Sequence, residues 1–173
     1  MKYTTIPFCQ MVASAWGNLL LAATAQGLCG MWFEGQKHRP DSSAWRDAPS
    51  PFIDRAQQQL AQYFAGQRST FDVPLDLTAG TAFQQTVWQA LLGIPCGQVA
   101  SYGSIAKELG NSAAVRAVGA AVGRNPISVI VPCHRVLGAT GALTGYAGGL
   151  DRKTALLQLE NASSMRPALV LTA

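Results

Sequence analysis

The tetrapeptide Pro132-Cys133-His134-Arg135 holds the residue types that nucleophilic chemistry requires. A cysteine attacks as its thiolate, and a thiol with an ordinary pKa of about 8.5 needs a base or positive surroundings to ionise at neutral pH. His134 is a candidate base, and Arg135 adds a positive charge. The tetrapeptide alone leaves two alternatives of equal weight, a catalytic cysteine and a buried structural thiol.

Direct hydrogen bonding between Cys133 and His134 is not expected in an extended chain, where neighbouring side chains point to opposite faces. A water molecule between them would relay the proton if a carboxylate held the imidazole in one tautomer. The acids after residue 80 are Glu108, Asp151 and Glu160. We expect Glu160 to face inward from the last helix and orient His134, with a solvated surface carboxylate as the simpler alternative.

Residues 102–122 have the pattern of two short helices separated by the tight turn Gly110-Asn111-Ser112, which is typical of a helix-turn-helix. The second helix, Ala113–Val122, combines small side chains with a single Arg116. It has too few polar groups to read base edges in the major groove. A lone arginine can instead contact phosphate or fill the space left by an extruded nucleotide. A plain helical hairpin remains the alternative.

The first half of the chain predicts a small α/β unit. Apolar runs at Leu19–Thr24 and Leu28–Phe33 form a β-hairpin, and Ser50 caps a helix over residues 51–65 whose apolar residues recur on one face. A short strand is expected at Phe71–Pro74, before a linker at 75–80. No group of chemically reactive residues stands out, so this half is interpreted as a scaffold.

The second half is expected to be mainly helical. Thr81 and Gln84 form a capping box at the start of one helix, and Asp151 caps the last one. Between them, Ile127–Val131 is a β-branched run suited to a buried extended segment that leads to Cys133.

Composition and charge exclude several classes of protein. Hydrophobic residues make up 49% and charged residues 13% of the chain, so an intrinsically disordered protein is excluded. No apolar run reaches the roughly 18 residues of a membrane span. Cys9, Cys29, Cys96 and Cys133 are widely spaced, and with His38 they fit no standard zinc motif, so neither a metal nor a disulfide framework is expected. These features favour a cytoplasmic protein.

The net charge of +4 is unevenly distributed. Six basic and six acidic residues balance in positions 1–80, whereas seven basic and three acidic residues occupy positions 81–173. No acid occurs from Leu109 through Leu150, a stretch that includes Arg116. This pattern favours a polyanion as partner, although the excess charge is small.

Taken together, these residues resemble the methylated-DNA–protein-cysteine methyltransferase family, the O6-alkylguanine-DNA alkyltransferases. The resemblance covers about Thr81 to Asn161, and the first 78 residues match the family's N-terminal domain more loosely. It rests on a series of motifs in order: Phe83-Gln-x-x-Val-Trp88, Ile94-Pro-x-Gly97, Ser101-Tyr-Gly, Arg116-Ala-Val-Gly, Asn125-Pro, Pro132-Cys-His-Arg-Val136 and Tyr146-x-Gly-Gly149.

The resemblance implies an α/β N-terminal domain of a small sheet plus a helix (residues 1–78). A mainly α, winged helix-turn-helix-like domain that binds DNA and transfers the alkyl group follows (79–173). It also implies irreversible direct repair, in which Cys133 takes the alkyl group from O6-alkylguanine, with O4-alkylthymine as an open second substrate. In this scheme His134 activates the thiol through water, Glu160 supports the imidazole, and Asn125 orders the turn before the active site.

The resemblance further implies that Arg116 takes the place of the flipped guanine in the stack. Tyr102 drives the nucleotide's rotation and donates a proton to the departing guanine, with Lys153 as a contributor. Many relatives carry serine at position 147, so here only backbone can reach the guanine oxygen. The remaining pocket residues share a lining role: Val136, Tyr146 and the backbone of Ala147.

The implied partner is double-stranded DNA carrying alkylated guanine, entered from the minor groove by a monomer, and cooperative binding along DNA is left open. No cofactor and no metal are expected, because transfer to a soft thiolate needs neither. Two other functions remain as alternatives. One is an alkyltransferase-like module that binds damage without transfer, against which Cys133 argues. The other is a Cys–His hydrolase, against which the helix-turn-helix argues.

Overall fold

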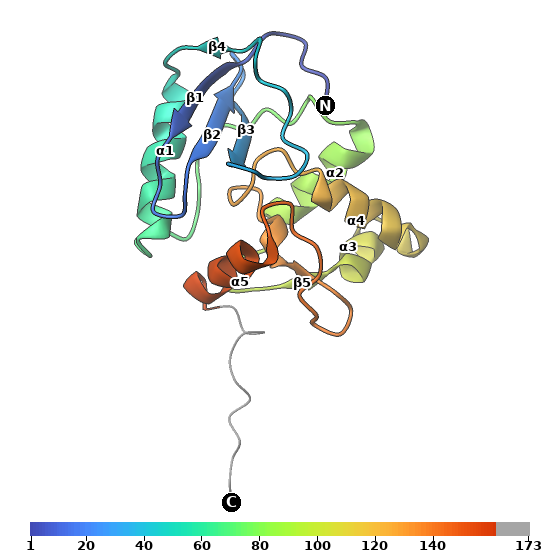
Figure 1. Ribbon diagram of the computed structural model, residues 1–173. Coiled ribbons are helices and arrows are strands. Elements are labelled where there is room, and N and C mark those ends of the chain that lie inside the picture. Colours follow the sequence, from blue (N-terminus) through green and yellow to red (C-terminus); the bar gives the residue numbers. More distant parts are fainter. Residues whose placement is uncertain (162–173) are drawn as a thin grey trace, which may run out of the picture.

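The computed structural model describes residues 1–161, in which an N-terminal α/β unit precedes a mainly helical C-terminal unit (Figure 1). The N-terminal unit is a four-stranded sheet with one face covered by helix α1 (Pro51–Phe64). Its strand order is β3-β2-β1-β4, with bounds β1 (Phe8–Val12), β2 (Leu19–Ala23), β3 (Leu28–Phe33) and β4 (Arg46–Asp47). The expected fold class is confirmed. Residues 162–173, which the sequence assigned to the second domain, lie outside the described residues.

The predicted hairpin of β2 and β3 is the most buried part of the sheet, with β3 as one edge strand. Leu19 and Leu21 pack in the main core with α1, whereas Leu20 lies in a second cluster with Trp32 on the opposite face. Both faces are therefore covered, which explains why β2 reads as a continuous apolar run rather than an alternating one. Strands β1 and β4 were not predicted from the sequence, because β1 is only half-buried and β4 has two residues.

One local prediction beside this sheet was wrong. Phe71–Pro74 is not a named strand; the segment makes only an isolated bridge between Leu28 and Leu75. Pro74 offers its carbonyl to Leu28 N but has no N–H with which to continue a ladder. Ser50 does stand at the N-cap position of α1, with Pro51 as the first helical residue, as predicted, although the Ser50 side chain makes no capping hydrogen bond.

The C-terminal unit contains α2 (Ala82–Leu92), α3 (Tyr102–Glu108), α4 (Val115–Gly123) and α5 (Leu150–Leu159). The two capping boxes, Thr81 with Gln84 and Ser101 with Ser104, explain why α2 and α3 begin where they do. A 3-10 turn, Ser112–Ala114, precedes α4, so the helix predicted at Ala113–Val122 begins slightly later, at Val115. Helix α5 begins before Asp151, which lies in its first turn rather than at its cap.

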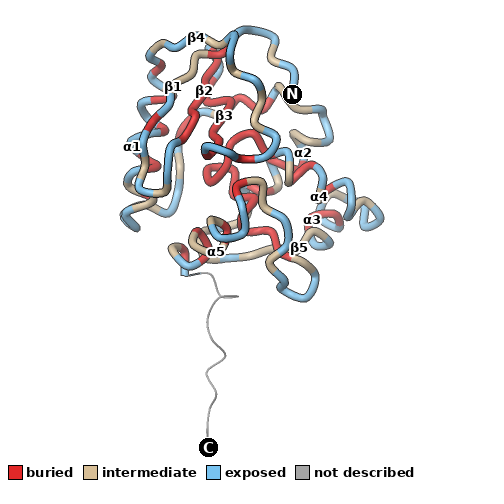
Figure 2. Tube along the Cα trace, in the orientation of Figure 1, coloured by how far each residue is buried: buried red, intermediate tan, exposed pale blue. Residues whose placement is uncertain are grey.

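Helices α3 and α4 form one exposed end of the molecule, held to the core through α2. The buried indole of Trp88 on α2 donates from Nε1 to the Ala121 carbonyl oxygen of α4 over 2.9 Å. Figure 2 shows the strands β2 and β3 buried along their length, while the outer turns of α3 and α4 are exposed. Two short parallel strands, β5 (Ala100–Ser101) and β6 (Val136–Leu137), connect this helical end to the segment that contains Cys133. No helix among residues 1–161 has the length and apolarity to cross a membrane.

Candidate active site

Cys133 is the first residue of a 3-10 turn, Cys133–Arg135, and its side chain is buried, with 5% of the residue exposed. The segment before it was expected to be extended, and that prediction was wrong. Ile127–Val131 is buried as predicted, but it folds back on itself. Val131 N donates to Ile127 O, and Val129 has a φ of 68°. Only Ile127 pairs with the sheet, through a bridge to Met31. The turn removes the alternation that was expected to separate Cys133 from His134.

Asn125 organises this turn and also reaches the thiol. Its Oδ1 accepts from Ile127 N over 3.0 Å, and its Nδ2 donates to Val131 O over 2.7 Å. The same Nδ2 donates to Cys133 Sγ over 3.0 Å. The amide replaces the backbone partners that a strand would have supplied, which explains why the apolar run is not extended. The sequence suggested the turn but not the contact with sulfur.

His134 and Glu160 are hydrogen-bonded at the centre of the site. His134 Nε2 lies 3.0 Å from Glu160 Oε1, and both side chains are buried. Because the carboxylate accepts, the neutral imidazole carries its proton on Nε2 and leaves Nδ1 as an acceptor. Nδ1 is buried and has no hydrogen-bond partner among residues 1–161. Burial lowers the pKa of His134, so a neutral ring is the resting form.

Glu160, the C-cap residue of α5, is surrounded by donors. Arg135 donates from Nε to Oε2 over 2.9 Å and from Nη2 to Oε1 over 2.7 Å. Tyr63 of α1 donates from Oη to Oε1 over 2.6 Å. Burial acts against ionisation of Glu160, but hydrogen bonds from His134, Arg135 and Tyr63 hold its pKa well below the usual range. The carboxylate is therefore a permanent negative charge beside His134.

The thiol itself is protonated at rest. Burial raises the pKa of Cys133 to about 11, while the hydrogen bond from Asn125 and the charge of Lys153 act in the opposite direction. Lys153 on α5 is buried and donates from Nζ to Val136 O over 2.6 Å and to Thr144 O over 2.7 Å. Burial lowers the pKa of Lys153 to about 8, so it remains charged at neutral pH. Attack by Cys133 therefore requires a base.

Several of the predicted pocket residues line a cavity of about 210 Å³. It is lined by Tyr102 at the start of α3, by Gly119 of α4, and by Tyr146 and Ala147 of the loop before α5. Burial raises the pKa of Tyr146, and a negative charge on Cys133 would raise it further, so the Tyr146 hydroxyl relates this cavity to the sulfur. Val136, predicted to line the pocket, is fully buried in β6 and is not among the residues that line this cavity.

The loop of residues 138–149 is positioned by specific contacts. Lys37 N donates to Ala147 O over 3.1 Å, and Lys153 holds the Thr144 carbonyl. A Cβ at Gly148 would lie 2.7 Å from Tyr146 Cε1, so only glycine lets the Tyr146 ring occupy its present position.

Arg116 lies apart from the buried cluster. It is exposed in the first turn of α4, next to Val115, which is 38% exposed. Helix α4 thus presents one long charged side chain on a surface of small residues, as the sequence predicted.

The N-terminal unit supplies groups that the sequence did not indicate. Tyr63 was recognised only as part of the apolar face of a helix, and no pattern in the chain predicts the partner of its hydroxyl. Lys37 and His38 line the cavity beside Tyr102, although their segment reads as an irregular polar loop. Arg135 was visible within the Pro-Cys-His-Arg sequence, but its bond to Glu160 depends on the tertiary fold.

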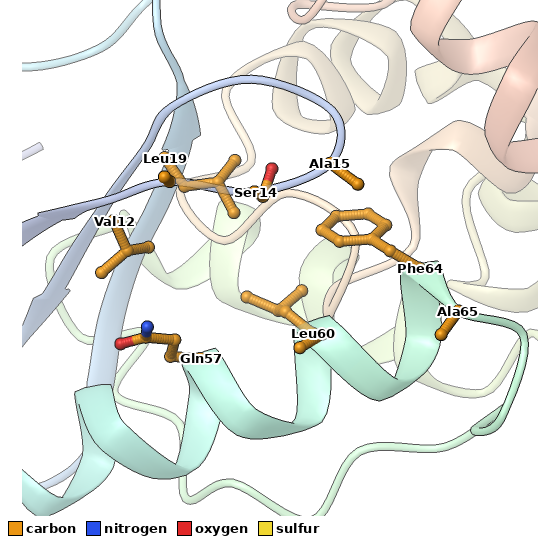
Figure 3. A pocket seen from close by; sticks show the side chains of 10 residues that line it. Val12, Ser14, Ala15, Leu19, Gln57, Leu60, Phe64 and Ala65 are labelled. Atoms are coloured by element: carbon orange, nitrogen blue, oxygen red, sulfur yellow. The ribbon is translucent and has the colours of Figure 1, made fainter.

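Two further features lie outside this site. An apolar hollow of about 390 Å³ lies between α1 and the β1–β2 turn (Figure 3). Val12, Leu60 and Phe64 line it, and none of the predicted site residues does. Within residues 1–161, no group of three or more His, Cys, Asp or Glu side chains could hold a metal ion.

The chemistry that this arrangement supports is nucleophilic attack by sulfur. A carboxylate fixes an imidazole, the imidazole leaves one nitrogen free to accept a proton, and the adjacent thiol needs that proton removed. An amide and an ammonium group then stabilise the resulting thiolate.

Sequence comparison identifies similar proteins over nearly the whole chain. Two family models match, described as the ribonuclease-like domain of 6-O-methylguanine DNA methyltransferase (residues 1–77) and its DNA binding domain (82–162). A methylated-DNA–protein-cysteine methyltransferase of Mycobacterium tuberculosis is 52% identical over 144 residues, covering 83% of this chain and 86% of the relative. One of Methanosarcina acetivorans is 50% identical over 145 residues, covering 83% of this chain and 92% of the relative.

Solved structures agree. The O6-methylguanine methyltransferase of Mycobacterium tuberculosis superposes with a TM-score of 0.81 at 48% identity, covering 94% of this chain and 96% of that one. The structure of the Mycobacterium tuberculosis protein in complex with DNA gives a TM-score of 0.81 at 46% identity, covering 91% and 96% of the two chains.

Proposed function

The chain belongs to the 6-O-methylguanine DNA methyltransferase family, and we propose that it repairs DNA by moving the alkyl group of O6-alkylguanine onto Cys133 Sγ. The observation that carries this proposal is the buried set of Cys133, His134 and Glu160, in which the thiol is protonated and His134 Nδ1 has no hydrogen-bond partner among residues 1–161.

Activation begins with proton transfer. The Cys133 proton passes through one water molecule to His134 Nδ1, since Nε2 is already engaged by Glu160. The Glu160 carboxylate stabilises the imidazolium that forms, as a buried carboxylate does for a catalytic histidine in hydrolases. Asn125 and the Lys153 ammonium stabilise the sulfur anion. The nucleophile is therefore formed only inside the site, where its charge is compensated.

Transfer then forms an S–C bond and breaks the bond between that carbon and guanine O6. The guanine leaves as its anion and takes a proton, for which the Tyr102 hydroxyl is the proposed donor, because Tyr102 lines the cavity beside Tyr146. The product on Cys133 is a thioether, which has no good leaving group. Each molecule therefore repairs one lesion and stops.

Access to the lesion requires that the nucleotide leave the helix. We propose that α4 enters the minor groove, where its small side chains allow close approach and Arg116 fills the vacated place in the stack. The DNA complex of the Mycobacterium tuberculosis relative supports binding to DNA. One chain holds every group named above, so a monomer suffices.

The experiment is a titration of the protein with an excess of duplex that carries a single O6-methylguanine. We expect the repaired DNA to reach a plateau at one lesion per protein molecule, and the Cys133→Ser variant to bind the duplex without repairing it. Repair that continues beyond the plateau would indicate a turnover enzyme. Tight binding without repair by the wild-type protein would indicate a damage-binding module. Either outcome would overturn the proposal.

A further inference from the structure

One oxygen of Glu160 accepts hydrogen bonds from two different structural units. His134 and Arg135, beside the nucleophile, both contact Oε1. The third donor is Tyr63, in the last turn of α1, whose hydroxyl lies 2.6 Å from the same atom. Tyr63 is the point at which the N-terminal sheet-and-helix unit touches the proton-accepting pair.

Tyr63 is fixed as a donor. It is 1% exposed, and its ring lies 5.3 Å from that of Phe71, centroid to centroid. Burial and the adjacent Glu160 charge raise the pKa of Tyr63, so it stays a neutral phenol at every physiological pH. A neutral phenol next to a carboxylate has its proton available for donation alone.

Donors that share one acceptor oxygen weaken each other. A strong O–H donor to Oε1 disperses negative charge that would otherwise stabilise a proton on His134. The charged and titratable groups around this pair are Arg135 and Cys96 on the Glu160 side, and Cys133, Arg135 and Lys153 on the His134 side. Tyr63 is a neutral donor to Glu160, and removing its hydroxyl changes no formal charge.

We propose that Tyr63 is a positioning residue for alkyl transfer: its hydrogen bond to Glu160 limits the basicity of the His134–Glu160 pair and keeps His134 a neutral proton acceptor. The N-terminal unit then contributes a residue that tunes the proton acceptor, and does not only support the fold. This inference rests on the proposed function, because it concerns the proton that Cys133 loses.

The test uses the two histidines of the chain, His38 and His134, whose imidazole signals can be followed separately by nitrogen-detected NMR. In Tyr63→Phe, which keeps the ring, we expect the titration midpoint of His134 to rise by about half a pH unit or more. The acid limb of the transfer rate should move in the same direction. The control is Tyr3→Phe, which removes a hydroxyl of the same unit that donates to Met1 Sδ and lies outside the His134–Glu160 pair.

The outcomes distinguish the proposed role of Tyr63 from the proposed alkyl-transfer function. Identical His134 signals in wild type and Tyr63→Phe, or an equal shift in Tyr3→Phe, would overturn the role of Tyr63. Absence of transfer by the wild-type protein would overturn the proposed function, and the NMR result would still decide whether Tyr63 tunes His134.

A second replacement covers the case in which Tyr63→Phe fails to fold. Placing 3-fluorotyrosine at position 63 keeps the hydroxyl and makes it a stronger donor, so the His134 midpoint should fall instead of rise. An unchanged midpoint in the folded fluorinated protein would count against the proposal as directly as an unchanged midpoint in Tyr63→Phe.

Discussion

The amide of Asn125 donates to Cys133 Sγ over 3.0 Å while it also holds the Val131 carbonyl at 2.7 Å. One side chain therefore shapes the turn that carries the nucleophile and contacts the nucleophile itself. This double use makes the backbone before Cys133 and the chemistry of its sulfur inseparable. Substitutions at Asn125 test both together.

Replacing Asn125 with alanine should lower both stability and reactivity. It leaves the buried Val131 carbonyl without this donor, for which we expect a loss of about 1–3 kcal/mol in the free energy of unfolding. Transfer to the thiol should slow as well, because the thiolate loses a hydrogen bond. Urea unfolding and the rate with free O6-methylguanine measure the two effects. Asn111→Ala removes an exposed amide without a capping bond and should change neither. Wild-type stability in Asn125→Ala would contradict the structural role.

Much of the fold is local enough to be predicted from the sequence. Capping boxes and apolar periodicity indicate α1 to α3, and the hairpin follows from two apolar runs around a glycine. The turn at Ile127–Val131 was not predictable in this way. Its β-branched residues favour a strand. In the folded-back form, the Asn125 amide at the end of α4 supplies hydrogen-bond partners for Val131 O and Ile127 N, and this contact is not visible in the pattern of the segment.

The site residues likewise fall into those that the local sequence indicates and those that only the tertiary fold brings together. Cys133, His134 and Asn125 lie within a short stretch of sequence, and Glu160 could be selected because few acids occur in that half. Tyr63 precedes Glu160 by 97 residues, and nothing local marks its hydroxyl as functional. Contacts between the two units depend on tertiary packing, which periodicity does not encode.

Lys153→Met should reduce transfer most strongly below pH 8. The Lys153 charge lowers the pKa of Cys133, and burial lowers the pKa of Lys153 itself to about 8. Lys153 is therefore protonated, and helps the thiolate, below that pH; the help disappears as the pH rises through it. The ratio of wild-type to variant rates with free O6-methylguanine should decline across this range.

A control for this experiment is Lys107→Met, which removes an exposed lysine of α3 and should leave the rate with the free base unchanged at every pH. A ratio for Lys153→Met that stays constant from pH 6 to about 10 would show that Lys153 acts only through its bonds to Val136 and Thr144.

Gly148→Ala should displace the Tyr146 ring, because the added Cβ would lie 2.7 Å from Tyr146 Cε1 and 3.4 Å from Phe33 Cδ2. We expect the rate of alkyl transfer to fall about tenfold, equivalent to about 1.4 kcal/mol, because the pocket loses its shape. Gly103→Ala, on exposed α3, meets only an ordinary contact and serves as the control. Equal rates in the two variants would mean that the Tyr146 ring does not shape the site.

Arg116→Ala should slow repair of duplex DNA about tenfold while leaving the reaction with the free base unchanged. The expectation follows from the isolation of Arg116 at the exposed start of α4. Arg124→Ala removes the same charge at the other end of α4 and accounts for general attraction to phosphates. If both variants lose the same activity with the same salt dependence, Arg116 is a phosphate contact and does not fill the stack.

The most direct test of the account is the identity of the atom that receives the alkyl group. The protein is incubated with a duplex carrying O6-methylguanine, digested, and its four cysteine peptides are compared by mass spectrometry. The account predicts a single added methyl group on the Cys133 peptide, equal in amount to the guanine restored. An unmodified Cys133 with the lesion repaired, or a methyl group on Cys9, Cys29 or Cys96, would contradict it.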